Sequence, residues 1–488
     1  MKKSILCWLA VGVIGCSDGG SAAVESPADP TVEGPITGPR DPFVAGTRGF
    51  TLEEVGYKEA EYFVSGTAVS YTNVGELDSD GRWEVEEADT ADYKTRALVY
   101  RPQDGNAFSG TVVVEWLNVS GGVDAAPDWS AMHTEIIREG HVWVGVSAQI
   151  VGIEGSGSDN SFSLHLKQVN PERYGSLLHP GDSFSYDMYS QIAQAIRNPV
   201  GVDPLGGLVA ERVIAVGESQ SAGRLVTYVN AFAPLYQVFD GYVIHSRGGG
   251  SPPLSQSPQA EVLTPEVVRV RDDLDDPVLT FQTESDIILL SSGPSTQPDS
   301  AMFRLWEVTG TAHADVYTLL TSNSDVGDDP SVAEVVEVTE PVPGLITCNA
   351  PINSGPMHWV LKAGLHGLVE WIITGTPLPE ADRLTVTADG EFELDELGNV
   401  LGGIRTNYVD APVAVLSGLG QTGESFCRIF GTTMLFGDAQ LSELYPTHQS
   451  YLDAVNSSTE SAIEAGFLLP VDAALIVADA ETSNIGGS

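Results

Sequence analysis

One short segment, residues 211–225 with the sequence ERVIAVGESQSAGRL, limits most strongly what this chain can fold into. It contains a continuous apolar run at 213–216, then a turn-like stretch with Ser219 and Ser221, and then residues with helical spacing. A continuous β-branched run is typical of a central parallel strand whose two faces are both covered. The segment therefore predicts an α/β fold in which a serine follows the end of a central strand.

The rest of the chain repeats this alternation of short β-branched runs, turn signals and helical stretches. The pattern indicates a mostly parallel central sheet with helices on both faces. Long segments at 151–185, 248–276 and 316–357 are the places where we expect cap insertions over a site. Strands are predicted at 61–71, 94–101, 111–118, 141–148, 211–217, 239–245, 277–283 and 303–308, and helices at 129–139, 186–197, 222–232 and 359–373.

Either serine of the segment could be the nucleophile of a strand–turn–helix elbow, which needs small residues two positions before and two after it. With Ser219 at the centre, Gly217 ends the strand and Ser221 begins the helix. The positive N-terminus of that helix then faces the reacting oxygen. With Ser221 at the centre, the strand would continue through Gly217 and Glu218, which have poor β-propensity. Ser219 is therefore the predicted nucleophile, and Ser221 is the alternative.

A serine of this kind needs a base and an acid, which in this architecture follow later strands in the order acid, then histidine. Asp286 lies just after the predicted strand 277–283, and His313 lies just after the next one. Both therefore belong to the carboxyl edge of the sheet, beside Ser219. Glu284 is the alternative acid because it lies two residues from Asp286.

The oxyanion that forms during attack on an acyl carbon needs two preorganised N–H donors. One is expected from the backbone of Gln220, the residue after the nucleophile. The other is expected from the Gly-rich loop after the third core strand, at Asn118 or Val119. An ordinary turn is the alternative interpretation of that loop.

Four further polar residues are candidates for a substrate pocket: His245, Arg247, Tyr174 and His179. For His179 and its neighbour Asp182, a loop fastened by side-chain hydrogen bonds is an equally good interpretation. The sequence has no HExxH and no paired Cys or His at ligand spacing, and no Gly-rich phosphate loop follows the first strand. We therefore expect neither a metal nor a cofactor.

The first residues resemble a bacterial export signal, with Lys2 and Lys3 ahead of an apolar run that ends at Cys16. Small or apolar residues before a cysteine are typical of a lipobox, so Cys16 is the predicted lipidation site and the protein is expected in the cell envelope. An ordinary signal peptide is the alternative. The predicted parts are a signal peptide at 1–15, a flexible tether at 16–42, the main α/β domain at 43–382 and a C-terminal extension at 383–488.

The extension is expected to contain a β-hairpin, a Gly-rich loop and one amphipathic helix at 440–465, all packed on the main domain. Cys348 and Cys427 remain as an even pair in an exported chain, which favours a disulfide. Two unpaired buried cysteines are the alternative. A disulfide would fasten the extension to the main domain.

The net charge of −44 at pH 7 argues against nucleic acids and anionic membrane surfaces as partners. A membrane contact is expected only through the lipid at Cys16. The charge carries no information about the fold.

Several stretches of the chain together resemble those of a family of bacterial, often exported, α/β-hydrolase-domain proteins. The resemblance implies an α/β-hydrolase core with Ser219, Asp286 and His313 as the matching triad, and it implies little about the substrate. The stretches are VEWLNVSGG (114–122), RYGSLLHPGDSFSYD (173–187), GESQSAGRL (217–225), IHSRGG (244–249), QTESD (282–286), WEVTGTAHAD (306–315) and LYPTHQSYL (444–452).

The leading hypothesis is therefore a serine hydrolase that cleaves a carboxylic ester, on a small molecule or a polymer, through an acyl-enzyme. A non-catalytic binding lipoprotein with the same fold is a second hypothesis. An amidase or peptidase that uses the same triad is a third, because a triad alone does not fix the bond that is cleaved.

Overall fold

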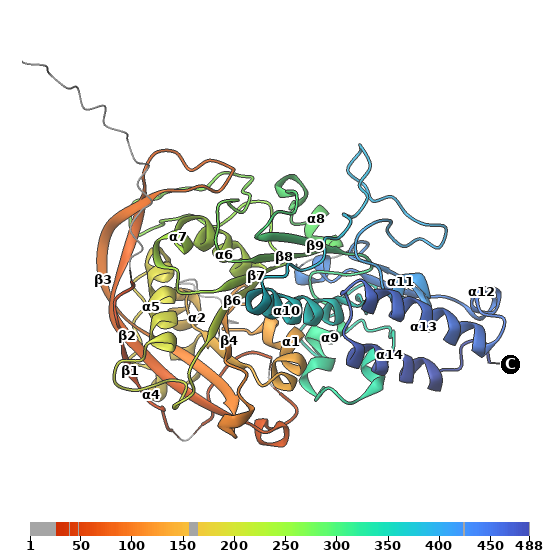
Figure 1. The fold of residues 1–488 in the computed structure, drawn as a ribbon, viewed down its shortest axis with the longest axis horizontal. Helices are drawn as coiled ribbons and strands as arrows, with labels where there is room; N and C mark the ends of the chain where they lie inside the picture. The colour runs from red at the N-terminus through yellow and green to blue at the C-terminus, as the bar shows by residue number, and fades with distance from the viewer. Residues whose placement is uncertain (1–25, 39, 47, 156–163, 423–424, 488) are drawn as a thin grey trace, which may run out of the picture.

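The computed structural model describes residues 26–38, 40–46, 48–155, 164–422 and 425–487. Within these residues, nine strands form one sheet in the order β1-β2-β3-β5-β4-β6-β7-β8-β9 (Figure 1). The strands are β1 Thr31–Glu33, β2 Tyr57–Asn73, β3 Val85–Pro102, β4 Thr111–Trp116, β5 Val142–Val146, β6 Arg212–Glu218, β7 Gly241–His245, β8 Val278–Thr283 and β9 Phe303–Val308. The eight predicted strands correspond to β2 through β9, so the prediction of the sheet is confirmed.

The sheet is parallel from β5 through β9 and antiparallel at its other end. β4 pairs in parallel with β5 and β6, and the pairs β6–β7, β7–β8 and β8–β9 are also parallel. β1, β2 and β3 form an antiparallel edge that joins β5. The carboxyl ends of β6, β8 and β9 therefore meet at one edge, where an open α/β sheet builds its site.

Helices cover both faces of the sheet, as predicted (Figure 1). Val112 and Val114 of β4 pack with α5 and α6 on one face, while Val113 packs with α1 and α10 on the other. Successive residues of a strand point to opposite faces, so a continuous apolar run fits only where both faces are covered. The helices are α1 Pro127–Arg138, α2 Ile150–Glu154, α3 Leu166–Val169, α4 Pro171–Tyr174, α5 Ser185–Arg197, α6 Gln220–Ala231, α7 Ala233–Tyr236, α8 Glu284–Ile288, α9 Val316–Leu319, α10 Met357–Thr374, α11 Asn407–Asp410, α12 Asp438–Leu444, α13 His448–Glu464 and α14 Pro470–Thr482.

The C-terminal extension lies at the β9 end of the sheet (Figure 1). It contains its own apolar cluster, which includes Trp359 of α10. The prediction of one helix at 440–465 is wrong, because α12 ends at Leu444 and α13 begins at His448. Pro446 lies between them, lacks a backbone N–H and disfavours a helical conformation in the residue before it. The extension also contains a small sheet of β10 Ala414–Ser417 and β11 Thr432–Leu435, which the sequence analysis did not predict as strands.

The tether predicted at 16–42 is wrong for its second half, because β1 pairs there with β2. Beyond β1, the Ile36 N–H donates to the Glu61 carbonyl, and Glu33 forms an ion pair with Lys94 at 2.7 Å. An edge strand of three residues carries too weak a pattern to be recognised in a Pro-rich and Gly-rich stretch. Cys16 and the predicted signal peptide lie outside the described residues.

Across the described ranges, none of the helices has both the length and the apolar character needed to cross a lipid bilayer.

Candidate active site

The segment 211–225 forms a sharp strand–turn–helix elbow with Ser219 at its apex. β6 ends at Glu218, α6 begins at Gln220, and Ser219 between them has φ 58° and ψ −116°. A positive φ in a residue with a side chain costs about 1–3 kcal/mol and is held only where the surroundings enforce it. A Cβ on Gly217 would lie 3.1 Å from the carbonyl group of Ser221, so any side chain there would crowd the first turn of α6. The Ser219 side chain is half-buried, whereas Ser221 is fully buried in α6.

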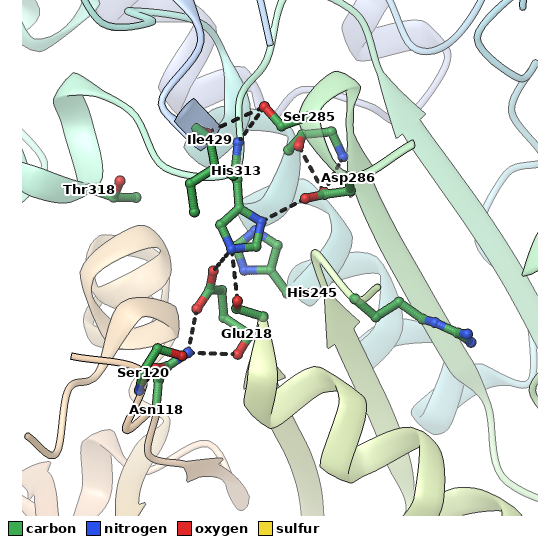
Figure 2. A network of polar contacts seen from close by, with 12 residues as sticks. Asn118, Ser120, Glu218, His245, Ser285, Asp286, His313, Thr318 and Ile429 are labelled. Carbon is green, nitrogen blue, oxygen red and sulfur yellow. Dashed lines mark hydrogen bonds and ion pairs between the residues drawn. The ribbon is translucent and has the colours of Figure 1, made fainter. Parts of the chain in front are cut away.

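Ser219, His313 and Asp286 form a continuous chain of polar contacts across the ends of three strands. His313 Nε2 lies 2.8 Å from Ser219 Oγ, and His313 Nδ1 lies 2.6 Å from Asp286 Oδ1. The other Asp286 oxygen accepts hydrogen bonds from the backbone N–H and the hydroxyl of Thr283, at 2.7 and 2.8 Å. The carboxylate is thus fixed on one side and faces the imidazole on the other (Figure 2). A hydroxyl group, an imidazole and a carboxylate in contact in this order are able to pass a proton from serine to histidine.

Glu284, the alternative acid, points away from His313. Its two oxygens accept from the backbone N–H groups of Gly310 and Gly418, at 2.6 and 2.8 Å. Burial raises the pKa of this carboxyl group to about 7. Asp286 is therefore the carboxylate that contacts His313. Glu284 instead connects the loop that carries His313 to the C-terminal extension.

A second carboxylate, which the sequence analysis did not assign to the site, contacts the histidine. Glu218 Oε1 lies 3.1 Å from His313 Nε2, on the edge of the ring that Ser219 also contacts (Figure 2). Burial lowers the pKa of His313, but the charges of Glu218 and then Asp286 outweigh this effect and raise the pKa to about 9. The available signal in the sequence was the position of Glu218 at the end of the predicted strand, immediately before Ser219.

The loop after β4, predicted to donate to an oxyanion, uses its asparagine differently. Asn118 Nδ2 donates to the carbonyl oxygen and to Oε2 of Glu218, at 3.1 and 3.0 Å, and Asn118 Oδ1 accepts from the Ser120 N–H at 2.8 Å. The Asn118 side chain therefore holds Glu218, and its backbone N–H donates to the Ala125 carbonyl oxygen at 2.9 Å, so the prediction of Asn118 as an oxyanion donor is corrected. Gln220 is the first residue of α6, so its N–H has no carbonyl of the helix to pair with. Gln220 and Val119 remain as candidate backbone donors.

Two of the predicted pocket residues are structural instead. Tyr174 is fully buried, and its hydroxyl group donates to Glu61 at 2.9 Å. His179 Nε2 lies 3.0 Å from the Ala148 carbonyl oxygen, and its Nδ1 accepts from the Gly181 N–H. The polar side-chain atoms of both residues are hydrogen-bonded within the protein. The prediction that they contact a substrate is therefore corrected.

Asp182, near His179, agrees with the alternative interpretation of this segment as a loop held by side-chain hydrogen bonds. Its carboxylate accepts from the Ile150 N–H at 2.9 Å and pairs with Arg224 at 3.0 Å.

His245 ends β7, Arg247 lies two residues beyond it, and both are also buried. Arg247 donates to the carbonyl oxygens of Gly248 and Gly249 at 2.9 Å and to that of Val268, so it supports a loop and is not available to a substrate. His245 Nδ1 lies 2.9 Å from Asp128 Oδ1, and burial lowers the pKa of His245 to about 4. His245 is therefore neutral and packs against Asp128 inside the protein. The prediction of substrate contact is corrected for His245 and Arg247 as well.

The C-terminal extension is bonded to the preceding domain by a disulfide, and residues near that disulfide contact the loops of the site. Cys348 and Cys427 are bonded, as predicted. Ser285 Oγ lies 2.7 Å from the carbonyl oxygen of Gly418 and 3.4 Å from that of Ile429, close to Cys427, and it accepts from the His313 N–H at 3.2 Å. The extension therefore contacts the loops that carry His313 and Asp286.

Among the described residues, one group of side chains is spaced closely enough to hold a metal ion, namely Glu135, Glu139 and His366. Arg138 Nη1 lies 2.6 Å from Glu135 Oε2 and already supplies positive charge there. The group involves none of the residues of the elbow.

The fold and the elbow define an α/β hydrolase, and comparison of the sequence with protein families agrees. A family model described as an alpha/beta hydrolase domain matches residues 32–478, so the chain belongs to this family. The match includes most of the C-terminal extension. No curated protein matches the sequence closely enough to count as a relative.

Three solved structures that match the chain are distantly similar to it. A putative dienelactone hydrolase from Klebsiella pneumoniae subsp. pneumoniae is 13% identical, with a TM-score of 0.27, over 50% of this chain and 85% of that one. A CE15 glucuronoyl esterase from Teredinibacter turnerae is 13% identical, with a TM-score of 0.27, over 60% of this chain and 76% of that one. A fungal esterase from Rhizomucor miehei is 13% identical, with a TM-score of 0.25, over 52% of this chain and 78% of that one. TM-scores this low do not establish a shared function or substrate. The assignment of the chain to the α/β-hydrolase family therefore rests on the match to the family model.

Proposed function

We propose that this protein is a serine hydrolase that cleaves a carboxylic ester through an acyl-enzyme. Ser219 is the nucleophile, His313 the general base and Asp286 the acid that orients it. The observation that carries the proposal is the unbroken series of contacts from Ser219 Oγ through His313 to Asp286, built on an elbow with positive φ at the serine. A buried proton relay that ends on a half-exposed hydroxyl group has the geometry of an activated nucleophile.

The reaction follows from these contacts in two stages. Ser219 Oγ attacks the acyl carbon while its proton passes to His313 Nε2, and Asp286 stabilises the imidazolium through Nδ1. The carbonyl oxygen gains negative charge and is stabilised by backbone N–H groups, for which Gln220 and Val119 are the candidates. His313 then gives its proton to the departing alcohol, and water repeats the sequence to release the acid and free Ser219.

Labelling with a fluorophosphonate probe and peptide mass mapping tests this proposal. We expect an adduct on Ser219 that is absent in Ser219→Ala and retained in Ser221→Ala, because Ser221 is buried and makes no contact with His313. Ser221→Ala is the matched control, two residues along the same segment. Absence of an adduct from folded wild-type protein would reject the serine hydrolase and favour a binding protein with this fold. Rates on matched ester and amide substrates then separate an esterase from an amidase.

We also propose that the mature protein is a cell-envelope lipoprotein attached through Cys16. The support is the apolar run that ends at this cysteine behind Lys2 and Lys3. In a bacterial host, we expect the wild type to incorporate labelled palmitate and to sediment with membranes, whereas Cys16→Ser loses both properties. Equal incorporation of palmitate by the two proteins would contradict the lipid anchor.

A further inference from the structure

The carboxylate of Glu218 is held in place against the base by a neighbouring loop. Its Oε1 lies 3.1 Å from His313 Nε2, while Oε2 and the Glu218 carbonyl oxygen accept from the same Asn118 amide group. The side chain is buried, so this contact is not weakened by solvent as an exposed ion pair would be. Neither the family match nor the Ser219–His313–Asp286 relay requires a carboxylate at this place.

The two carboxylates contact opposite ends of the same imidazole ring. Asp286 contacts Nδ1 and Glu218 contacts Nε2, the atom that exchanges a proton with Ser219. When His313 takes the serine proton, its new N–H lies between Ser219 Oγ and Glu218 Oε1. An ionised carboxylate at that position attracts the positive ring and has no comparable attraction for the neutral ring, so it favours the state that resembles the transition state.

We propose that Glu218 is a positioning residue for His313, which fixes the Nε2 edge of the ring and stabilises the imidazolium as Ser219 attacks. This role rests on the proposed function, because it requires proton transfer from Ser219. The proton balance is simple: the Oγ–H bond breaks, the proton forms the Nε2–H bond, and Glu218 accepts a hydrogen bond from that group without taking the proton.

The role implies a particular pH dependence. Burial raises the pKa of Glu218 to about 7, and a nearby ionised Glu218 helps to raise the pKa of His313 to about 9. The reactive state has neutral His313, so the rate rises with pH through the pKa of His313. Removal of the Glu218 charge lowers that pKa and moves the rise to lower pH. The other titratable groups around the pair are Asp286, His245, Asp128 and Asp315.

The inactivation rate of the full-length protein by a fluorophosphonate, measured from pH 5 to 10, tests this role without knowledge of the substrate. We expect Glu218→Gln to shift the midpoint of the rise downward by about one pH unit and to lower the rate at the plateau by about tenfold. Glu218→Asp keeps the charge and is expected to retain a midpoint nearer that of the wild type. Glu464→Gln, which removes one exposed charge at the end of α13, is the control and is expected to leave the profile unchanged.

A midpoint that is the same in the wild type, Glu218→Gln and Glu218→Asp would overturn the role, even if all rates fell, because loss of packing alone does not move a titration. If Glu218→Gln does not fold, NMR titrations of His313 in the wild type and in Asn118→Ala, which releases the Glu218 carboxylate while Asp286 stays in place, decide the question. A wild-type His313 pKa at or below about 6.5, the ordinary value, or the same pKa in both proteins, would reject the stabilisation. Failure of wild-type Ser219 to react would instead reject the proposed function, and the NMR titration would still report on the contact between Glu218 and His313.

Discussion

Asp286→Asn is expected to lower the rate of Ser219 acylation by about 10⁴-fold while leaving the protein folded. Thr283 donates two hydrogen bonds to one Asp286 oxygen, so the carbonyl oxygen of the new asparagine takes that position. Its NH₂ group then faces His313 Nδ1 and donates to it. This places the ring proton on Nε2, the atom that must accept the proton of Ser219, so His313 cannot act as the base.

Glu284→Gln is the matched control, because Glu284 is a buried acid two residues away that contacts two backbone N–H groups. One glutamine oxygen can replace only one of the two acceptors, so we expect stability to fall by about 1–3 kcal/mol. The acylation rate of the folded protein is expected to stay within a few-fold of the wild type. Rates measured with a fluorophosphonate and melting temperatures of both variants give the answer. The reverse result, loss of activity in Glu284→Gln alone, would make Glu284 the acid.

Local patterns were sufficient to predict the sheet and the order of Ser219, Asp286 and His313. Each of these residues follows a buried strand, and parallel strands bring their carboxyl ends to one edge whatever lies between them. The three residues can therefore be placed at one edge from the ends of their buried strands, which apolar periodicity indicates well.

Contacts between segments far apart in the chain were not predictable in the same way. Asn118 donates a hydrogen bond to Glu218, which lies 100 residues further along the chain. The apolar periodicity of the sequence does not predict such a contact. Tyr174 and His179 have the composition of a pocket, yet each is paired with protein atoms from another segment. A polar residue on a loop has the same sequence signal whether its partner is a substrate or a buried carboxylate, so the choice needs the tertiary structure.

Removal of the Cys348–Cys427 disulfide is expected to destabilise the protein by about 4 kcal/mol. The bond closes a loop with a sequence separation of 79 residues, and a cross-link of that span restricts the unfolded chain strongly. Both cysteines are buried in an apolar cluster with Ile352 and Phe430, so alanine is the suitable replacement because serine would bury a hydroxyl group. Chemical denaturation of Cys348→Ala/Cys427→Ala against the wild type measures the loss.

The same double variant is also expected to weaken the site, because the disulfide fastens the segment that reaches Ser285. Phe430 donates its N–H to the Cys427 carbonyl oxygen. The carbonyl oxygens of Gly418 and Ile429 lie 2.7 and 3.4 Å from the hydroxyl oxygen of Ser285, which receives the His313 N–H. Acylation at a temperature where the variant is folded should therefore slow by a few-fold, far less than in Asp286→Asn. Wild-type protein treated with a reductant is the control and should reproduce both effects. Unchanged stability after reduction would mean that packing of the extension alone holds this segment against the His313 loop.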